Sequence, residues 1–319
     1  MHTILILIIS LIALLWASNH LVTGAVELAH RFQIPPFIIG LTLIAIGTST
    51  PELILSIISS LRNETDLTLG NAIGSNIANI GLVLGITILI QPTVLNNHSV
   101  KKTYPILIIA MLFVYSLILD GYLSKIDGCL FLIACIAAIS IFIYLAYQSS
   151  LKDPFFNKFK SAMTVKNSLK INISTIVLGL LILPISAKYI VANVAQLAGG
   201  LGMSELTIGL TIQAIGTTLP ELVTSIIAAF KGEEDLAIGT ILGSNIYNLL
   251  LVLAFPALIN PNKISTIILW RDLPIIILLT LFLLFLNYNH KKKLSPWHGG
   301  VLVLIYCSYV ASLIIKAQH

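Results

Sequence analysis

The sequence predicts an all-α integral membrane protein of ten transmembrane helices, arranged as two inverted five-helix repeats with broken helices 2 and 7. The prediction rests on the apolar composition, the length of the apolar runs and an internal repeat. Hydrophobic residues make up 57% of the 319 residues, charged residues make up 10%, and the mean hydropathy is +0.99. Soluble domains carry about 25% charged residues. Most of this chain must therefore lie in lipid.

The apolar runs have the length of membrane spans. A hydrocarbon core of about 30 Å needs roughly 20 apolar residues per helix. Runs of this kind lie at 3–29, 34–61, 67–91, 103–120, 127–149, 171–198, 204–230, 236–259, 266–288 and 296–316. Turn residues and charges separate them. The longest separating segment, 150–170, is polar and basic, and it is too short to form a domain.

The basic residues lie between the apolar runs, so we expect no nucleic-acid partner despite the net charge of +5. Lys and Arg favour the cytoplasmic side of a membrane. With both termini outside, the outer segments carry Arg62, Lys125, Lys263, Arg271 and Lys316. The inner segments carry Arg31, Lys101, Lys102, Lys152, Lys158, Lys160, Lys166, Lys170, Lys231, Lys291, Lys292 and Lys293. This bias predicts a multi-pass protein of the cell membrane with a cytoplasmic 150–170 loop.

An internal repeat divides the chain. A shift of 169 residues aligns 40–84 with 209–253 without a gap, so that GTSTPE at 47–52 meets GTTLPE at 216–221. Five spans precede the second copy, so the two copies cross the membrane in opposite directions. Inverted repeats are typical of secondary transporters, whose substrate sites lie near the midplane at broken helices. The predicted units are a first repeat at 1–149 (motif 40–85), a connecting loop at 150–170 and a second repeat at 171–319 (motif 209–254).

A proline breaks a predicted span in each copy of the motif. Pro51 and Pro220 lack the backbone N–H that a continuous helix requires, whereas the first turn of a new half-helix tolerates proline. Ser49 and Thr218 occupy the capping positions before them. The preceding half-helix ends with its negative dipole end at the break. We expect free carbonyl groups there, suited to a cation, at Ala45, Thr48, Ala214 and Thr217.

A glutamate follows each proline. A charged side chain near the bilayer centre costs about 3 kcal/mol or more, so it needs a partner or a water-filled cavity. Of the thirteen acids, we expect only Glu52 and Glu221 to lie deep within spans. Their equivalent positions in the two copies favour a shared role over two separate structural hydrogen bonds.

The second half of each motif adds neutral oxygen atoms. Ser75 and Asn79 are four residues apart and share one helix face, as do Ser244 and Asn248. Carboxylate, hydroxyl, amide and carbonyl oxygens together suit hard cations such as Ca²⁺ and Na⁺. No His or Cys joins the set, which disfavours zinc and copper. The alternative role for a single Ser or Asn is hydrogen bonding between helices.

The paired GT[ST]xPE and GSNIxN segments resemble the two alpha repeats of the sodium/calcium exchanger family, part of the calcium/cation antiporter superfamily. The resemblance is to the prokaryotic type, without the large regulatory insert of animal members. It implies a cation site between spans 2, 3, 7 and 8. The implied ligands are Glu52, Glu221, Ala45, Thr48, Ser49, Ser75, Asn79, Ala214, Thr217, Thr218, Ser244 and Asn248. Some prokaryotic members have Asp where this chain has Asn248.

The implied function is antiport. A protein of this family would export Ca²⁺ in exchange for Na⁺ by alternating access at the shared two-glutamate site, as a monomer and without a cofactor. Ca²⁺/H⁺ exchange and K⁺-dependent exchange remain alternatives within the superfamily, and a cation channel is a more distant one. We expect no enzymatic activity, because no nucleophile–base motif accompanies the two carboxylates.

Overall fold

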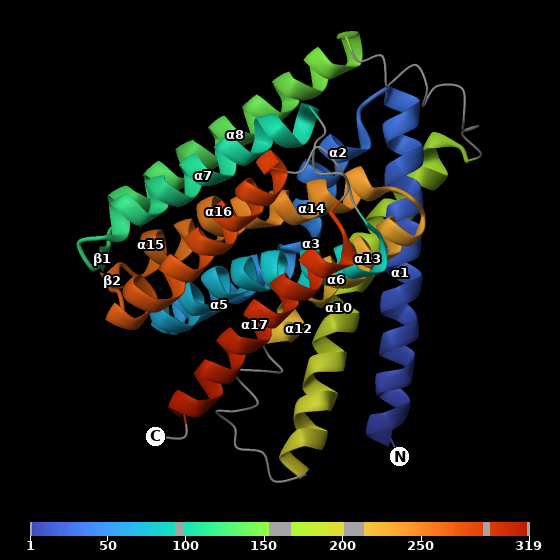
Figure 1. Cartoon of the computed structure of the whole chain (residues 1–319). Coiled ribbons are helices and arrows are strands. Elements are labelled where there is room, and N and C mark those ends of the chain that lie inside the picture. Colours follow the sequence, from blue (N-terminus) through green and yellow to red (C-terminus); the bar gives the residue numbers. More distant parts are fainter. Residues whose placement is uncertain (1, 93–97, 153–166, 201–213, 290–293, 318–319) are drawn as a thin grey trace.

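The predicted spans are helical in the computed structural model, which describes residues 2–92, 98–152, 167–200, 214–289 and 294–317 (Figure 1). Among these residues, eight segments are long and apolar enough to cross a membrane. They are Thr3–Phe32, Pro36–Leu61, Thr65–Ile90, Lys125–Leu145, Leu169–Leu197, Glu234–Ile259, Ile268–Phe285 and Pro296–Ile315. Two shorter apolar helices, Thr103–Ile118 and Leu219–Phe230, correspond to the remaining predicted spans. The start of the predicted span 204–230 lies outside the described residues.

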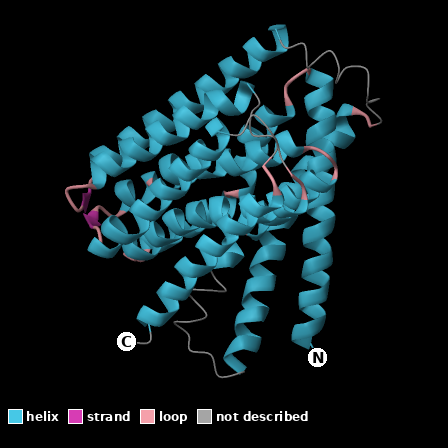
Figure 2. Cartoon of the chain, viewed as in Figure 1, coloured by secondary structure: helices cyan, strands magenta, loops and turns pink. Residues whose placement is uncertain are grey.

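Helices dominate the described part of the chain (Figure 2). The only strands there, β1 (Tyr122–Leu123) and β2 (Asn262–Lys263), form one short antiparallel pair. The helices without an internal change of type are α1 (His2–Phe32), α7 (His98–Ile118), α8 (Lys125–Lys152), α10 (Leu169–Gly200) and α17 (Pro296–Ala317). The all-α prediction is therefore confirmed.

The other spans consist of several helical pieces. The first is α2 (Pro36–Ile39), the π-helix η1 (Gly40–Ile44), α3 (Ala45–Thr48) and α4 (Thr50–Leu61). The next is α5 (Thr65–Ala78), π-helix η2 (Asn79–Leu84) and α6 (Gly85–Ile90). In the second half they are α12 (Ala214–Thr217), α13 (Leu219–Phe230), α14 (Glu234–Tyr247), η4 (Asn248–Val252) and α15 (Ala254–Ile259). The π-helix η5 (Ile268–Asp272) precedes α16 (Leu273–Asn289).

The helix breaks occur where the prolines predict them. Ser49 separates α3 from α4 with φ −81° and ψ 7°, and Thr218 separates α12 from α13 with φ −90° and ψ 2°. Both residues thus occupy the sparsely populated region between helix and strand geometry. Pro51 and Pro220 lie in the first turn of the following helix, where the missing N–H leaves no donor unpaired. The two breaks have the same backbone geometry.

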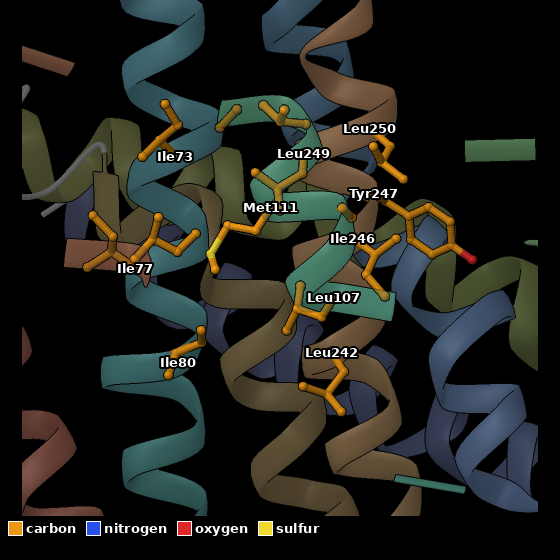
Figure 3. Close-up of a cluster of buried hydrophobic side chains, with 14 of the residues drawn as sticks. Ile73, Ile77, Ile80, Leu107, Met111, Leu242, Ile246, Tyr247, Leu249 and Leu250 are labelled. Atoms are coloured by element: carbon orange, nitrogen blue, oxygen red, sulfur yellow. The ribbon is translucent and has the colours of Figure 1, made fainter. Parts of the chain in front are cut away.

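The helix α14 lies at the centre of the bundle. It packs against α2, η1 and α3 of the first half and against α13 of the second. A Cβ atom added to Gly243 would lie 2.4 Å from the Leu41 carbonyl oxygen, so only glycine permits this backbone approach. On another side of α14, Leu242 and Ile246 pack with Leu107 of α7 and Ile77 of α5 in the largest apolar cluster (Figure 3).

Two long helices, α1 and α10, run side by side at one edge of the bundle (Figure 1). Their contact is close, because a Cβ atom on Gly179 would lie 2.8 Å from Leu21 Cβ. The helix α1 also packs against α13. The contact includes a Ser18–Thr224 hydroxyl pair at 3.4 Å and hydrogen bonds from Lys231 Nζ to α1.

Candidate cation-binding site

Two glutamates lie near each other inside the bundle. Glu52 lies in the first turn of α4, and Glu221 lies in the first turn of α13. Both side chains are 0% exposed. The carboxylates are close enough for their charges to interact. Each helix break therefore delivers one acid to a common interior position.

Hydroxyl groups hold Glu221. Its Oε1 accepts hydrogen bonds from Ser49 Oγ at 3.2 Å and from Ser244 Oγ at 3.5 Å. The Thr48 hydroxyl also lies beside this carboxylate. Ser49 and Thr48 belong to the first break, so the first half of the chain solvates the acid of the second half. The other oxygen, Oε2, has no partner in the described residues.

Glu52 has no comparable support. Neither of its oxygens accepts a hydrogen bond within the described part of the chain. The Ser75 hydroxyl lies beside the carboxylate but outside hydrogen-bonding geometry. The Thr218 hydroxyl, which occupies the position equivalent to Ser49, donates to the Ile215 carbonyl at 2.9 Å instead. Because an unpaired buried charge is strongly unfavourable, Glu52 has a larger unmet demand for positive charge than Glu221.

Two asparagines complete the set of buried oxygens. Asn79 and Asn248 begin the π-helices η2 and η4, which are rare elements that occur often at functional sites. Both side chains are 0% exposed, and neither their amide oxygens nor their amide nitrogens have a partner in the described residues. Two buried amide groups whose four polar atoms are unpaired are costly unless a ligand or water meets them. Ser75 and Ser244 are equally buried, at 2% and 0% exposed.

The carbonyl groups at the breaks differ from the expectation. The Ala45 carbonyl oxygen was expected to be free, but it accepts a bond from Ser49 N at 3.0 Å and one from Thr48 Oγ1 at 3.4 Å. At the second break, Thr218 N donates to the Ile215 carbonyl oxygen at 3.2 Å.

Sequence reasoning missed one residue beside the second break. Thr217 Oγ1 donates a hydrogen bond of 3.4 Å to Asn71 Oδ1, which joins α12 to α5 across the two halves. The Asn71 amide nitrogen is buried without a partner in the described residues. Its position one turn before Ser75 on the same helix face was the available signal.

Asp272 is a further buried acid, near the start of a span. Asp272 is 4% exposed within the span Ile268–Phe285. It accepts hydrogen bonds from Arg271 Nε at 2.7 Å, from Arg271 Nη2 at 3.0 Å and from Tyr309 Oη at 3.0 Å. Its charge is thus compensated locally, because a buried carboxylate is tolerated where a cation and hydrogen-bond donors surround it.

The candidate site combines two carboxyl groups with neutral oxygen atoms. No group of three or more His, Cys, Asp and Glu side chains suitable for a metal occurs in the residues that the structure describes. The predicted residues Ser49, Ser244 and Glu221 meet by direct hydrogen bonds, and Glu52 lies beside them. The surrounding neutral oxygens are of the kind that Ca²⁺ and Na⁺ accept.

The family model of the sodium/calcium exchanger proteins matches residues 2–149 and 171–315, which is nearly the whole chain. The chain belongs to the sodium/calcium exchanger family.

Several relatives of this exchanger family are similar along their full length. A putative antiporter, CaxA, of Alkalimonas amylolytica is 35% identical over 95% of this chain and 95% of its own. The sodium/calcium exchanger MaX1 of Methanosarcina acetivorans is 31% identical over 97% of both chains. The inner membrane protein YrbG of Escherichia coli is 35% identical over 97% of this chain and 94% of its own.

The fold agrees with a solved structure of the same family. The sodium–calcium exchanger NCX_Mj, soaked with Na⁺ and Sr²⁺, superposes with a TM-score of 0.84 at 27% identity, over 97% of this chain and 98% of that one. The exchanger described here is therefore a multi-pass membrane antiporter of the calcium/cation antiporter superfamily. It is a transporter and not an enzyme, as the sequence predicts.

Proposed function

We propose that this exchanger exports Ca²⁺ in exchange for Na⁺, by alternating access at one site that contains both Glu52 and Glu221. The observation that carries the proposal is the pairing of these two buried carboxylates, with Glu221 Oε1 bonded to Ser49 and Ser244. Two carboxylates neutralise one Ca²⁺. Since Ca²⁺ and Na⁺ prefer the same oxygen ligands, their occupancy is mutually exclusive, and exclusive occupancy of one site produces exchange.

The proposed ligand set is the one that the sequence predicts. The neutral ligands are the hydroxyl and amide groups of Ser49, Ser75, Asn79, Thr218, Ser244 and Asn248, and the carbonyl groups of Ala45, Thr48, Ala214 and Thr217. The Ala45 carbonyl oxygen accepts hydrogen bonds from Ser49 N and from Thr48 Oγ1. Because a carbonyl oxygen has two lone pairs, a cation would take the place of the Thr48 hydroxyl, whose bond is the longer one at 3.4 Å.

We propose further that ten crossings form two inverted repeats, residues 1–149 and 171–319, joined by a cytoplasmic loop at 150–170. The matching break geometries at Ser49 and Thr218 support this arrangement. The π-helices begin at the equivalent residues Asn79 and Asn248. The match to the family model also divides at 150–170. Each unit contributes one acid, and the protein acts as a monomer because a single chain contains both.

The test is radiolabelled Ca²⁺ flux in proteoliposomes with an imposed Na⁺, K⁺ or pH gradient. We expect an outward Na⁺ gradient to drive Ca²⁺ uptake, and we expect Glu52→Gln and Glu221→Gln to abolish it. Glu64→Gln is the matched control, because Glu64 is an exposed acid next to α5. Undiminished flux in either site variant would contradict the assignment of the site.

Ca²⁺/H⁺ exchange is the second candidate. The charge of the site favours this candidate. Asn79 and Asn248 are neutral amides, so Glu52 and Glu221 supply the two carboxylates. Two protons would neutralise this pair as completely as one Ca²⁺. The relative CaxA is itself named only as a putative antiporter. Ca²⁺ uptake driven by a pH gradient in the absence of Na⁺ would replace the first proposal with this one, and a K⁺ requirement would indicate K⁺-dependent exchange.

A further inference from the structure

Asn76 and Asn245 are equivalent residues of the two repeats, and they contact each other. Asn76 Nδ2 donates a hydrogen bond of 3.1 Å to the Asn245 carbonyl oxygen, across a separation of 169 residues. Both side chains are 0% exposed. Two equivalent residues of a repeat can touch only where the two copies meet. The pair therefore lies on the axis that relates the proposed repeats.

The hydrogen bond between them runs in one direction only. Both side-chain atoms of Asn245 are buried without a partner in the described residues. A buried unpaired amide is costly, whereas the reciprocal bond to the Asn76 carbonyl would satisfy it. The local sequences are equal, GSNI in both copies, and each asparagine lies in the last turn before a π-helix. The shared GSNI segment therefore does not itself explain the difference.

The helix packing is unequal in the same way. Ile54 and Ile58 of α4 are 50% and 42% exposed, whereas their equivalents on α13, Val223 and Ile227, pack against the apolar cluster of α1. The hydroxyl pair Ser18–Thr224 joins α1 to α13. Helix α1 thus covers one face of α13, whereas the equivalent face of α4 is exposed. If the two repeats alternate access to one site, we expect this unequal arrangement to be one of two states in which the roles of the halves are exchanged.

Some other differences are fixed by sequence and would not reverse. Ser56 Oγ donates a hydrogen bond of 2.7 Å to the Val252 carbonyl oxygen. This carbonyl lacks its usual helical donor because residue 256 is proline, which has no N–H. The equivalent carbonyl, at Val83, accepts the hydroxyl of Thr87 at 2.7 Å. Ser225, the equivalent of Ser56, is therefore left without a partner in the described residues. The asparagine pair differs from this case because its two partners are identical.

We propose that Asn76 and Asn245 are positioning residues that exchange roles as hydrogen-bond donor when the protein passes between its two access states. In the present state Asn76 donates to Asn245. In the opposite state, with α10 covering α4, Asn245 donates to the Asn76 carbonyl. The inference rests on the proposed antiport function and adds to it the residues at the axis that favour each state.

The experiment measures the two states by disulfide cross-linking of the full chain. The three native cysteines, Cys129, Cys135 and Cys307, are first replaced. The pair Ser18→Cys and Thr224→Cys then detects the contact between α1 and α13, because the two native hydroxyls are 3.4 Å apart. The equivalent pair one repeat away, Leu55→Cys with Ala187→Cys, reports α10 on α4. The oxidation rate of each pair is measured in proteoliposomes.

Asn76→Leu removes the bond that is present, so we expect the α1–α13 pair to cross-link about fivefold more slowly and the α10–α4 pair faster, a change of the size expected for one buried hydrogen bond. Asn245→Leu should shift both rates in the opposite direction, and the double variant should return them towards the parent. Ser225→Ala is the control, because this buried hydroxyl has no partner to lose.

Shifts of the same sign in both single variants, or no shift in either, would overturn the proposal. The Asn→Ala pair gives the same comparison if the leucine variants do not fold. Ca²⁺ flux is measured separately on the parent protein. If the parent shows no Na⁺-driven or pH-driven flux, the proposed function fails, while the cross-linking rates still decide the roles of the two asparagines.

Discussion

The helix break that carries Glu52 and the one that carries Glu221 are near copies in sequence but have different surroundings. Glu221 accepts hydrogen bonds from Ser49 and Ser244, whereas the oxygens of Glu52 have no partner in the described residues. The acid of the second half is solvated by the first, and the reverse does not hold. The difference shows that one repeat motif can supply two unlike halves of a site when the helices around it are packed unequally.

The largest effect should come from neutralising each acid in turn. Glu52→Gln and Glu221→Gln should each reduce Ca²⁺ flux by more than 100-fold, because a divalent cation would keep only one negative charge. In the absence of cations, Glu52→Gln should raise the melting temperature more than Glu221→Gln, since it removes the unsupported charge. Thermal unfolding in calcium-free detergent checks this order, and equal shifts would contradict the comparison.

The next effect concerns the hydroxyl groups at the two breaks. Ser49→Ala should weaken Ca²⁺ binding by about tenfold, because a hydrogen bond to a charged group contributes about 1.5–3 kcal/mol. Thr218→Val should weaken binding less, since its hydroxyl donates to the Ile215 carbonyl of its own helix. Calcium titration of the two purified variants measures both losses of affinity. A larger loss at Thr218 would show that Glu52 depends on that hydroxyl.

A smaller effect concerns the second pair of equivalent serines. Ser56→Ala should lower the free energy of unfolding by about 1–3 kcal/mol, because it leaves a buried carbonyl group without a donor. Ser225→Ala should be neutral or stabilising, since its hydroxyl has no partner in the described residues. Denaturation in detergent measures the free energy of unfolding of both variants. Equal losses would mean that Ser225 has a partner of similar value.

The smallest effect is a pH dependence at the end of α13. Burial, with the nearby Asp235, raises the pKa of Glu233 to about 7 from its ordinary value near 4.5. A carboxyl whose pKa is raised in the folded state favours folding when protonated, so this stability is present below pH 4.5 and is lost as the pH rises through 7. Glu233→Gln should remove the fall in melting temperature over this window. The equivalent exposed acid offers the control Glu64→Gln, which should leave it unchanged.

Much of the fold could be predicted because it depends on local chemistry. The runs at 34–61 and 67–91 became the segments Pro36–Leu61 and Thr65–Ile90, since apolar length and turn residues mark such ends well. The π-helices η2 and η4 could not be predicted, because they differ from an α-helix by one extra residue per turn and leave no clear periodic signal. The Asp272 site was also missed, since its partner Tyr309 is 37 residues away.

The candidate site could also be predicted only in part. Glu52, Glu221, Ser49 and Ser244 were identified from the motif, and the fold brings them together. The state of the Ala45 carbonyl was predicted wrongly, because proline removes a donor at position 51 but leaves Ser49 N free to reach back by four residues. Asn71 was missed because its partner Thr217 belongs to the other half.

The sequence by itself determined the apolar spans, the positions of the two helix breaks and the two acids that follow them. These follow from the hydrophobicity of each run and from the missing N–H of proline, which act within a few residues of chain. Only the tertiary structure decided which glutamate receives hydroxyl donors and which asparagine donates to the other. The GT[ST]xPE and GSNI segments occur in both copies, so they do not themselves decide which copy receives the donors. The inequality arises from long-range packing, in which α1 covers α13 while the equivalent face of α4 stays exposed.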